Sequence, residues 1–300
     1  MYSPQPGIFA QGTHNHYHLE FEIHSDAASD LVRSSIRSFL ELRSSLDGVL
    51  NAVIGFGPIV SEILFNQDLP ASFSGFSQTG ISSRHSAPAT QKDIWVWLHA
   101  NDSDVLFDAA CSISSIFSPI GTLNTEVPCF LYQAGRDMTG FIDGTENPSL
   151  AKAPEVAVVP DSKPGAGGSI AIVMRWVHNL KKFNDLSLLE QEKVIGRTKL
   201  DSVELPDDIK PPTAHISRVV IQDDDSNEIE IYRRSVPYGT TNEHGLFFVA
   251  FSQDQTRFQS MLDAMFGLSS DALFDQLLDY STPVSGSYYF VPSLQALSSI

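Results

Sequence analysis

The chain has 300 residues, of which 42% are hydrophobic and 10% aromatic, so it is long enough for two packed domains and too apolar to be disordered. Nineteen Lys and Arg against 36 Asp and Glu give a formal charge of −17, which excludes nucleic acid and anionic membranes as expected partners. Cys111 and Cys129 match no metal-ligand spacing, and MYSPQPGIF carries no signal segment, so a cytoplasmic location is expected.

The first half of the chain alternates between patterns typical of strands and of helices. Strands are predicted at 17–23, 49–56, 94–99 and 127–132, and helices at 27–42 and 101–117. Gly57-Pro58 and the Ser-, Gly- and Pro-rich stretch that follows predict a loop. This order predicts a split-βαβ, ferredoxin-like domain over residues 1–135.

The same alternation restarts after residues 151–168, whose many Pro and Gly residues predict a surface loop. Strands are predicted at 169–177 and 246–251, a hairpin at 218–234 turned at DDDSN, and helices at 187–195, 253–266 and 271–280. We therefore expect an α+β fold of two ferredoxin-like domains with antiparallel sheets, the second over residues 136–300.

The most unusual segment is GFIDGTENP, in which two glycines bracket Asp143 within an apolar context. The local pattern alone is also typical of an Asx-turn or a helix N-cap. The nine residues resemble the signature of the dye-decolorizing peroxidases, and the chain looks most similar to the bacterial B-type members of that family. The resemblance implies a chlorite-dismutase-like architecture, one haem b per chain, and Asp143 overhanging the haem iron.

The family carries its axial histidine in a His-x-x-Arg stretch at the start of a strand, and His215 in PTAHISRVVI fits that position. Pro211-Pro212 stiffen the approach to it, and a neutral imidazole is a natural donor to haem iron. A histidine satisfied within the core or a loop is the alternative.

Strand periodicity singles out Arg233 in EIEIYRRSVPYG, because it shares a face with Ile229 and Ile231. A guanidinium on an apolar face is costly unless an anion or a cofactor awaits it, whereas Arg234 beside Glu230 predicts a solvated pair. Family members carry an arginine here before a Pro-aromatic-Gly triplet, which the chain supplies at 237–239. Two residues after this arginine, family members often have asparagine, whereas this chain has Ser235. We expect Ser235 to lie at the distal pocket.

The family's axial histidine donates its outer N–H to a carboxylate, which raises ligand basicity. DALFDQLLDYSTPVSGSYYFVPS resembles the family's C-terminal helix and strand, so the partner is expected to be Asp275 or Asp279. Four residues apart, the two share a helix face and spacing cannot separate them. Asp275 is favoured.

Further cofactor contacts are implied by the resemblance. Arg197 in VIGRTK matches an arginine that pairs with a haem propionate, although a cation that meets the dipole at a helix C-terminus is the alternative. Glu146 and Asn147 are expected at the haem edge, and Leu246 and Phe248 against the distal face.

His14, His16 and His18 alternate along a predicted strand and could face one divalent metal ion. No carboxylate or fourth ligand of suitable spacing accompanies them, so a metal site is not favoured.

The resemblance spans nearly the whole chain and implies a peroxidase that reduces hydrogen peroxide and oxidises bulky aromatic, dye-like donors. Asp143 would move the peroxide proton while Arg233 stabilises the developing negative charge. The reference pKa of aspartate, near ~4, predicts a mildly acidic optimum. Bulky dyes are not expected to enter this pocket, so electrons would pass through a surface tyrosine or tryptophan, with Tyr232, Tyr238 and Trp176 as unranked candidates.

Three other interpretations remain: a haem-handling protein that carries haem or releases its iron, with incidental peroxidase activity; a chlorite-dismutase-like enzyme; and a purely structural protein. The chlorite-dismutase family lacks the GFxDGT aspartate and is disfavoured. Family members form dimers or larger rings, so a homo-oligomer is expected. No extension of the kind that directs family members into encapsulin shells is evident after SLQALSSI.

Overall fold

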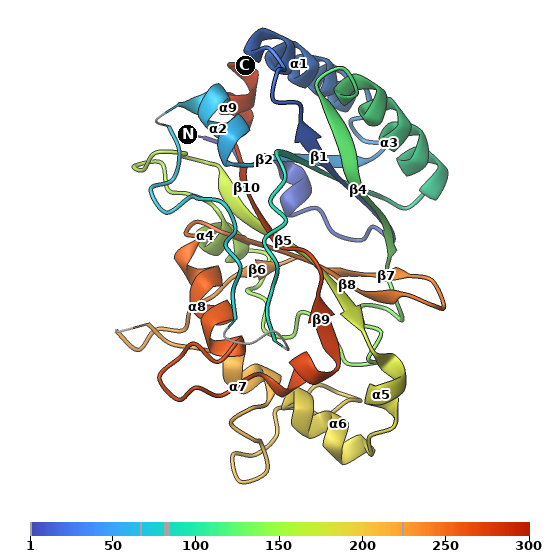
Figure 1. Ribbon diagram of the computed structural model, residues 1–300, viewed down its shortest axis with the longest axis vertical. Coiled ribbons are helices and arrows are strands. Elements are labelled where there is room, and N and C mark those ends of the chain that lie inside the picture. Colours follow the sequence, from blue (N-terminus) through green and yellow to red (C-terminus); the bar gives the residue numbers. More distant parts are fainter. Residues whose placement is uncertain (1, 67, 81–84, 224) are drawn as a thin grey trace.

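The computed structural model of the protein describes residues 2–66, 68–80, 85–223 and 225–300. Its central feature is one antiparallel sheet of ten strands (Figure 1). The strands are β1 Asn15–Ile23, β2 Asn51–Phe56, β3 Ile94–Ala100, β4 Gly121–Phe130, β5 Ser169–His178, β6 Tyr232–Arg233, β7 Val236–Gly239, β8 His244–Ser252, β9 Ser281–Pro283 and β10 Ser287–Val291.

Eight of these strands close into a barrel. They follow the order β8-β7-β4-β1-β3-β2-β10-β5, and β5 returns to pair with β8 along Ile170–Val177. The strands of the two halves of the chain meet at two short seams, where Cys129 pairs with Tyr238 and Phe56 pairs with Phe290. The predicted strands are therefore present, but both halves contribute to one closed sheet.

Helices cover the outside of the barrel. They are η1 Pro6–Ile8, α1 Ser29–Ser45, α2 Pro58–Phe65, α3 Ser103–Phe117, α4 Ala153–Ala157, α5 Leu180–Asn184, α6 Leu188–Ile195, α7 His215–Val219, α8 Thr256–Met265, η2 Gln276–Asp279 and α9 Leu294–Ser298. Figure 1 shows α1 and α3 on one side of the strands and α5 to α8 at the opposite end. Apolar residues of α1 and α3 pack on the outer faces of β1 and β3, and those of α8 on β5 and β8.

The inside of the barrel is a separate core. It holds Trp95, Trp97, Val173, Phe247 and Tyr289, which come from strands on opposite sides of the closed order. All seven residues of β3 are buried because helices cover one face of the strand and the barrel interior covers the other.

Two predicted loops contain helices. Pro58 follows the end of β2 and opens α2, since proline is favoured at the first helical position, where no N–H is needed. Within 151–168, expected wholly at the surface, α4 buries Ala153 and Ala157, and Val159 is also buried. The small alanines let this segment pack closely against the barrel, a role that its composition did not reveal.

Two further elements differ from their predictions. The predicted hairpin at 218–234 is shorter, because Arg218 lies in α7. The described residues pair from Ile221–Ile229 through the bridge between Gln222 and Glu228 to Asp223–Asn227. Part of its DDDSN turn, Asp224, lies outside the described residues. The predicted helix at 271–280 is only the short η2, since a side-chain cap at Asp275 starts the turn late.

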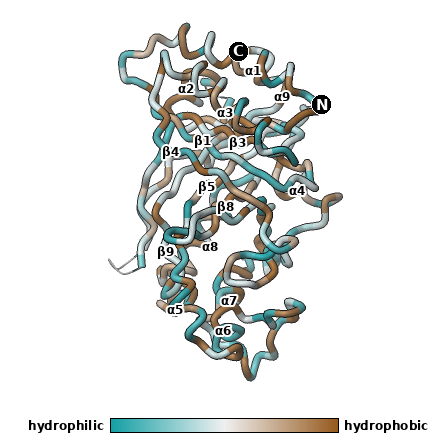
Figure 2. Tube along the Cα trace, turned by 90° about the vertical axis from the view of Figure 1, so that its right-hand side faces the viewer, coloured by the Kyte–Doolittle hydropathy of each residue, from teal (hydrophilic) through white to brown (hydrophobic). Residues whose placement is uncertain are grey.

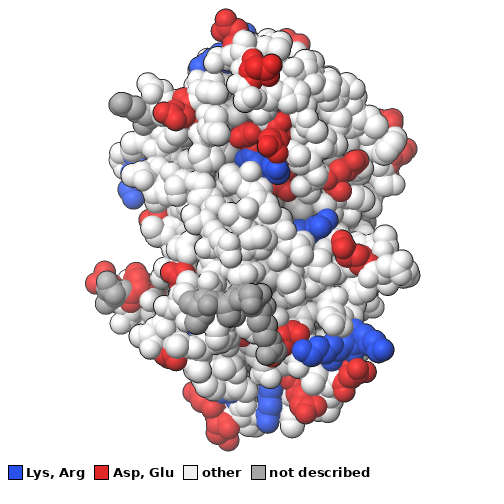
Figure 3. Space-filling view, viewed as in Figure 1, with Lys and Arg blue, Asp and Glu red and all other residues white. Residues whose placement is uncertain are grey.

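No helix among the described residues is long and apolar enough to cross a membrane. The hydropathy tube of Figure 2 alternates between apolar and polar positions around the strands and around α6 and α7. Acidic side chains are scattered over the face in Figure 3 and exceed the basic ones there, consistent with the charge of −17.

Candidate functional site

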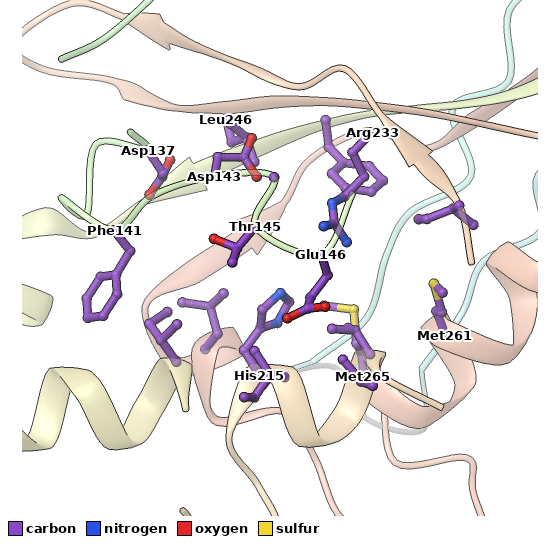
Figure 4. A pocket seen from close by; sticks show the side chains of 18 of the residues that line it. Asp137, Phe141, Asp143, Thr145, Glu146, His215, Arg233, Leu246, Met261 and Met265 are labelled. Atoms are coloured by element: carbon purple, nitrogen blue, oxygen red, sulfur yellow. The ribbon is translucent and has the colours of Figure 1, made fainter. Parts of the chain in front are cut away.

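An apolar cavity lies outside the barrel, between the outer faces of β5 and β8, the helices α7 and α8, and the loop that carries GFIDGTENP. Figure 4 shows His215 on one side of it and Asp143 with Arg233 on the other. Most of the remaining wall is apolar, formed among others by Ile172, Met174, Ile231, Leu246, Phe248, Phe258, Met261 and Met265. The three side chains that the sequence singled out are thus brought to one enclosed space.

His215 is the first residue of α7, not the start of a strand as predicted. The turn of α7 packs against α8, and its first position aims the ring into the cavity, where the side chain is 30% exposed. The Nδ1 of His215 lies 2.6 Å from Oδ2 of Asp275, which is 1% exposed. Because a carboxylate can only accept, Nδ1 donates, and Nε2 is the ring nitrogen left to bind a metal.

The elements around His215 are tied together by charged side chains. Oδ1 of Asp275 accepts from Leu277 N at 2.8 Å, so this carboxylate caps η2 while it holds the histidine. Arg218, three residues after His215, donates to Ala264 O and forms a two-pronged pair with Asp271. The arginine of the His-x-x-Arg stretch therefore fastens α7 to α8.

Asp143 belongs to a tight hairpin in which Arg136 bridges Ile142, and its N donates to Gly135 O at 3.1 Å. Burial raises the pKa of its carboxyl above the ordinary value, while the positive charge of Arg233 lowers it. Asp137, a second acid on the cavity wall, raises it further. The result is a carboxyl that holds a proton more readily than a solvated aspartate.

Arg233 enters the cavity beside Ile231, as the strand periodicity predicts. Its backbone is clamped by Asn147, whose amide donates to Arg233 O and accepts from Arg233 N, both at 2.8 Å. Among the described residues its Nε has no hydrogen-bond partner. Burial lowers the pKa of this guanidinium, and Asp143 raises it. A buried cation with an unused donor indicates a missing anionic or acceptor group.

Arg234 does not form the predicted solvated pair with Glu230. It is directed into the barrel, where it donates to Ile8 O at 2.5 Å and Ala10 O at 2.6 Å and lies over the ring of Trp97. The prediction failed because the opposite face of this strand meets the barrel interior rather than solvent, which periodicity alone could not show.

The other predicted cofactor contacts divide into two groups. Leu246, Phe248, Arg197 and Glu146 line the cavity. Arg197 pairs with Glu146 and donates to Ser202 O at 2.6 Å, and its Nε has no partner among the described residues.

Asn147 and Ser235 do not line the cavity. They line a second pocket of about 440 Å³, which shares Asp143 and Arg233 with the first. Asn147 is occupied by the backbone of Arg233, and Ser235 Oγ by the backbone of Val249.

The remaining candidates lie elsewhere. Asp279 contacts His85. His14 is exposed and precedes β1, while His16 and His18 are buried in the barrel among tryptophan rings. No group of three metal-ligating side chains occurs among the described residues, the cluster of histidines included.

The three radical candidates are not at the surface. Tyr232 is 1%, Tyr238 5% and Trp176 8% exposed, because their strands lie within the barrel or on the wall of the cavity. The prediction of surface positions for them was wrong.

Sequence reasoning missed a polar chain at one end of the cavity. His178 Nε2 lies 3.0 Å from Oδ1 of Asp137, and its Nδ1 lies 2.8 Å from Ser281 Oγ. These residues come from three separate segments, so no local spacing could have revealed them. Their contribution to the site is a second carboxylate, that of Asp137, near Asp143.

The residues fit a haem group. The cavity offers one imidazole nitrogen that could bind iron, apolar walls for a macrocycle, and unused guanidinium nitrogens on Arg197 and Arg233. His215 and the Asp143–Arg233 pair face each other across it, so His215 could hold the group while the pair acts on a reactant.

Comparisons with known proteins agree with this reading. The family model described as Dyp-type peroxidase, N-terminal, matches residues 5–128, and that of the C-terminal domain matches residues 134–296. A dye-decolorizing peroxidase of Mycolicibacterium paratuberculosis is 38% identical over 251 residues, which cover 83% of this chain and 71% of that protein.

Two solved structures are similar throughout. A Shewanella oneidensis protein assigned to the Dyp-type peroxidases superimposes with a TM-score of 0.94 at 32% identity, covering 100% of this chain and 99% of that one. A variant of DypB from Rhodococcus jostii, solved in complex with haem, has a TM-score of 0.88 at 32% identity and covers 97% and 96% of the two chains.

Proposed function

The chain belongs to the Dyp-type peroxidase family, and we propose that His215, Asp143 and Arg233 carry its reaction. It is a haem peroxidase, which reduces hydrogen peroxide and oxidises organic donors. The observation that supports these residue roles is their placement: one imidazole nitrogen and one acid–guanidinium pair face each other across a single apolar cavity.

His215 would hold the haem iron through Nε2. Haem, when bound, supplies the metal at which the peroxide bond is cleaved and the site that stores the oxidising equivalents. The Asp275 carboxylate fixes the ring orientation and increases electron donation by the imidazole through the Nδ1 hydrogen bond. Arg197, which lines the same cavity, is available to a propionate once its contact with Glu146 opens.

Asp143 would accept a proton from the near oxygen of hydrogen peroxide and deliver it to the leaving oxygen. The raised pKa of Asp143 suits the first half of this exchange, because a base that is too weak would not take the proton. Arg233 stabilises the negative charge that develops as the bond breaks, and Asn147 keeps it in position by holding its backbone. The apolar wall keeps water away from the proton being moved.

Finer assignments are part of the same proposal. The gap between the two matched family models, at residues 129–133, supports a boundary near 135 between two ferredoxin-like units that share the barrel. Two free cysteines support a reducing, cytoplasmic location. A homo-oligomer, a dimer or larger, remains a prediction from the family resemblance.

The test is rapid mixing of the haem-loaded protein with peroxide. We expect a fast spectral change in the wild type that slows by about 10²–10³-fold or more in Asp143→Ala or Arg233→Leu. A haem-handling protein would instead react slowly and be indifferent to both changes. Loss of the wild-type Soret spectrum in His215→Ala checks the axial ligand, and an unchanged spectrum there would disprove that assignment.

A further inference from the structure

The barrel interior contains a stack of oxidisable rings that the peroxide reaction does not use. Trp95 lies between Tyr289, at a centroid distance of 5.8 Å, and Trp97, at 6.3 Å, with interplanar angles of 23° and 12°. His99 stacks on Trp97 at 4.3 Å. Trp95, Trp97, Tyr289 and His99 are all fully buried.

Trp97 is hydrogen-bonded to a base. Its Nε1 donates to Nδ1 of His16 at 3.1 Å, and an indole N–H can only donate, so this imidazole nitrogen carries no proton. Burial, followed by the charge of Arg234, lowers the pKa of His16 to about 4, which keeps the ring neutral. An unprotonated acceptor is therefore held against the N–H bond of Trp97.

Tyr289 repeats this arrangement at the other end of the stack. Its hydroxyl donates to Oε1 of Glu20 at 2.6 Å, and both side chains are buried. Burial raises the pKa of Glu20, and its hydrogen bonds to Tyr289, Thr125 and Ser287 lower it. Two of the three stacked side chains thus have a proton acceptor on the group that becomes acidic when the ring loses an electron.

Arg234 holds a fixed positive charge over the ring of Trp97. Its guanidinium lies 5.0 Å from the centre of the Trp97 ring and is held there by the carbonyls of Ile8 and Ala10. A fixed cation at this distance stabilises the neutral indole and disfavours an indole radical cation. Loss of the N–H proton takes the positive charge off the indole, and the Nε1–Nδ1 hydrogen bond makes His16 the acceptor, although burial and Arg234 disfavour a protonated His16.

One sheet separates this stack from the haem cavity. In β5 and β8, Met174 and Phe248 point into the cavity, while the alternate residues Val173 and Phe247 point into the barrel. Phe247 in turn stacks on His18 at 4.1 Å, and His18 lies 6.0 Å from both tryptophan rings. The route from the cofactor to the tryptophans crosses the thickness of a single strand layer.

Resting on the proposed function, we propose that the barrel interior is a second, internal oxidation site that takes up oxidising equivalents when no external donor is bound. One electron passes from Trp97 to the oxidised haem group, the Nε1–H bond of Trp97 breaks, and the proton moves to Nδ1 of His16. The products are a neutral tryptophan radical and a protonated imidazole. An electron from a donor, together with the proton on His16, restores Trp97, so the site protects the cofactor without consuming the protein.

The test is electron paramagnetic resonance of the haem-loaded protein, frozen shortly after mixing with peroxide in the absence of donor. Protein grown with ring-deuterated tryptophan should show a neutral tryptophan radical that narrows on deuteration. Trp97→Phe should lose this signal and bleach faster with excess peroxide, while turnover with saturating donor stays near wild type. His16→Phe, which keeps a ring but removes the base, should lose the neutral radical as well.

Phe21→Leu is the matched control, because Phe21 is buried on the outer face of β1 and its loss loosens the core without removing an oxidisable ring. It should keep the radical. An undiminished tryptophan signal and wild-type bleaching in Trp97→Phe would overturn the inference.

A second readout separates this inference from the proposed function. Protein loaded with zinc protoporphyrin and oxidised by light in the presence of an electron acceptor needs neither peroxide nor Asp143. Formation of the Trp97 radical there, with no reaction towards peroxide in the haem form, would retain the internal site and reject the peroxidase mechanism. Normal peroxide reactivity with no light-driven transfer from Trp97 would do the reverse.

Discussion

At Asp143 two influences act on one carboxyl in opposite directions. Burial raises its pKa above the ordinary 3.8, and the neighbouring guanidinium of Arg233 lowers it. The aspartate must be ionised to accept the peroxide proton, so peroxide activation should increase as the pH rises through this pKa. On the acidic side of the expected optimum the rate should therefore fall, with a midpoint above pH 3.8. This fall is the acid limb of the pH profile.

Replacing Arg233 by Leu should shift that limb. Removal of the cation takes away the influence that lowers the pKa of Asp143, so the limb moves to higher pH, and the maximal rate falls because the developing charge is no longer stabilised. The pH dependence of the rate of peroxide activation measures both effects. Arg233→Lys, which keeps the charge, should leave the limb close to wild type. A shift to lower pH in Arg233→Leu would contradict the coupling.

The pairing of His215 with Asp275 gives a second prediction for single residues. Asp275→Asn keeps a hydrogen-bond acceptor but removes the negative charge, so the imidazole donates less to the iron. We expect a higher haem reduction potential in spectroelectrochemical titration and a haem affinity lower by about 10–100-fold. Asp279→Asn is the control, since Asp279 pairs with His85 while His215 pairs with Asp275. Equal effects of the two changes would reject the assignment.

Among the elements, α7 has the greatest influence on the site because its first residue is His215. Its position depends on the end of α6, where Gly196 adopts a left-handed conformation with φ of 94°. A Cβ at Gly196 would lie 2.5 Å from Cγ1 of Ile216, the residue after His215. The close approach of two helices is thus the reason for this glycine.

Gly196→Ala should therefore disturb haem ligation as well as stability. The left-handed backbone alone costs about 1–2 kcal/mol with a side chain, and the clash displaces α7. Urea unfolding of the haem-free protein and the Soret spectrum of the loaded protein measure the two consequences. Gly48→Ala provides the comparison, because Gly48 has φ of 77° but no atom within 4 Å of its Cβ position. Wild-type ligation in Gly196→Ala would show that α7 does not depend on this contact.

Predictions for individual elements succeeded where the pattern is local. Local strand-like patterns, alternating in β1 and mostly apolar in β3 and β5, identified β1, β3, β5 and β8. Each of these strands has one face in the barrel and the other under helices or a cavity. The local pattern failed at α7, which follows Pro211-Pro212, and at η2, whose start is set by the capping side chain of Asp275. The placement of Arg234 failed for a related reason, because a strand pattern reveals two faces but not which of them is solvated.

At the scale of the whole molecule the barrel joins both halves of the chain. β2 pairs with β10 and β4 with β7, so a fragment of residues 1–135 would lose the partners of two strands and expose the ring stack of β3. The two sequence units are therefore expected to fold as one cooperative structure.

Chemical unfolding of the haem-free protein tests this expectation. Tryptophan fluorescence reports mainly on the barrel interior through Trp95 and Trp97, and far-ultraviolet circular dichroism reports on all helices. The two probes should give coincident transitions, and the fragment 1–135 should not yield a stable fold. Separate transitions, or a stable fragment, would show instead that each half forms a domain on its own.

The sequence by itself determined the family and the strands with clear local patterns, and it singled out His215, Asp143 and Arg233 as candidates, because a nine-residue motif and a two-residue period are local properties. Only the tertiary structure decided that Asp275 rather than Asp279 meets the histidine, that Arg234 enters the barrel, and that the sheet closes. Those outcomes depend on which surfaces pack together across the chain. The local sequence does not specify which of two residues, four apart on a helix or adjacent on a strand, meets a given packing partner.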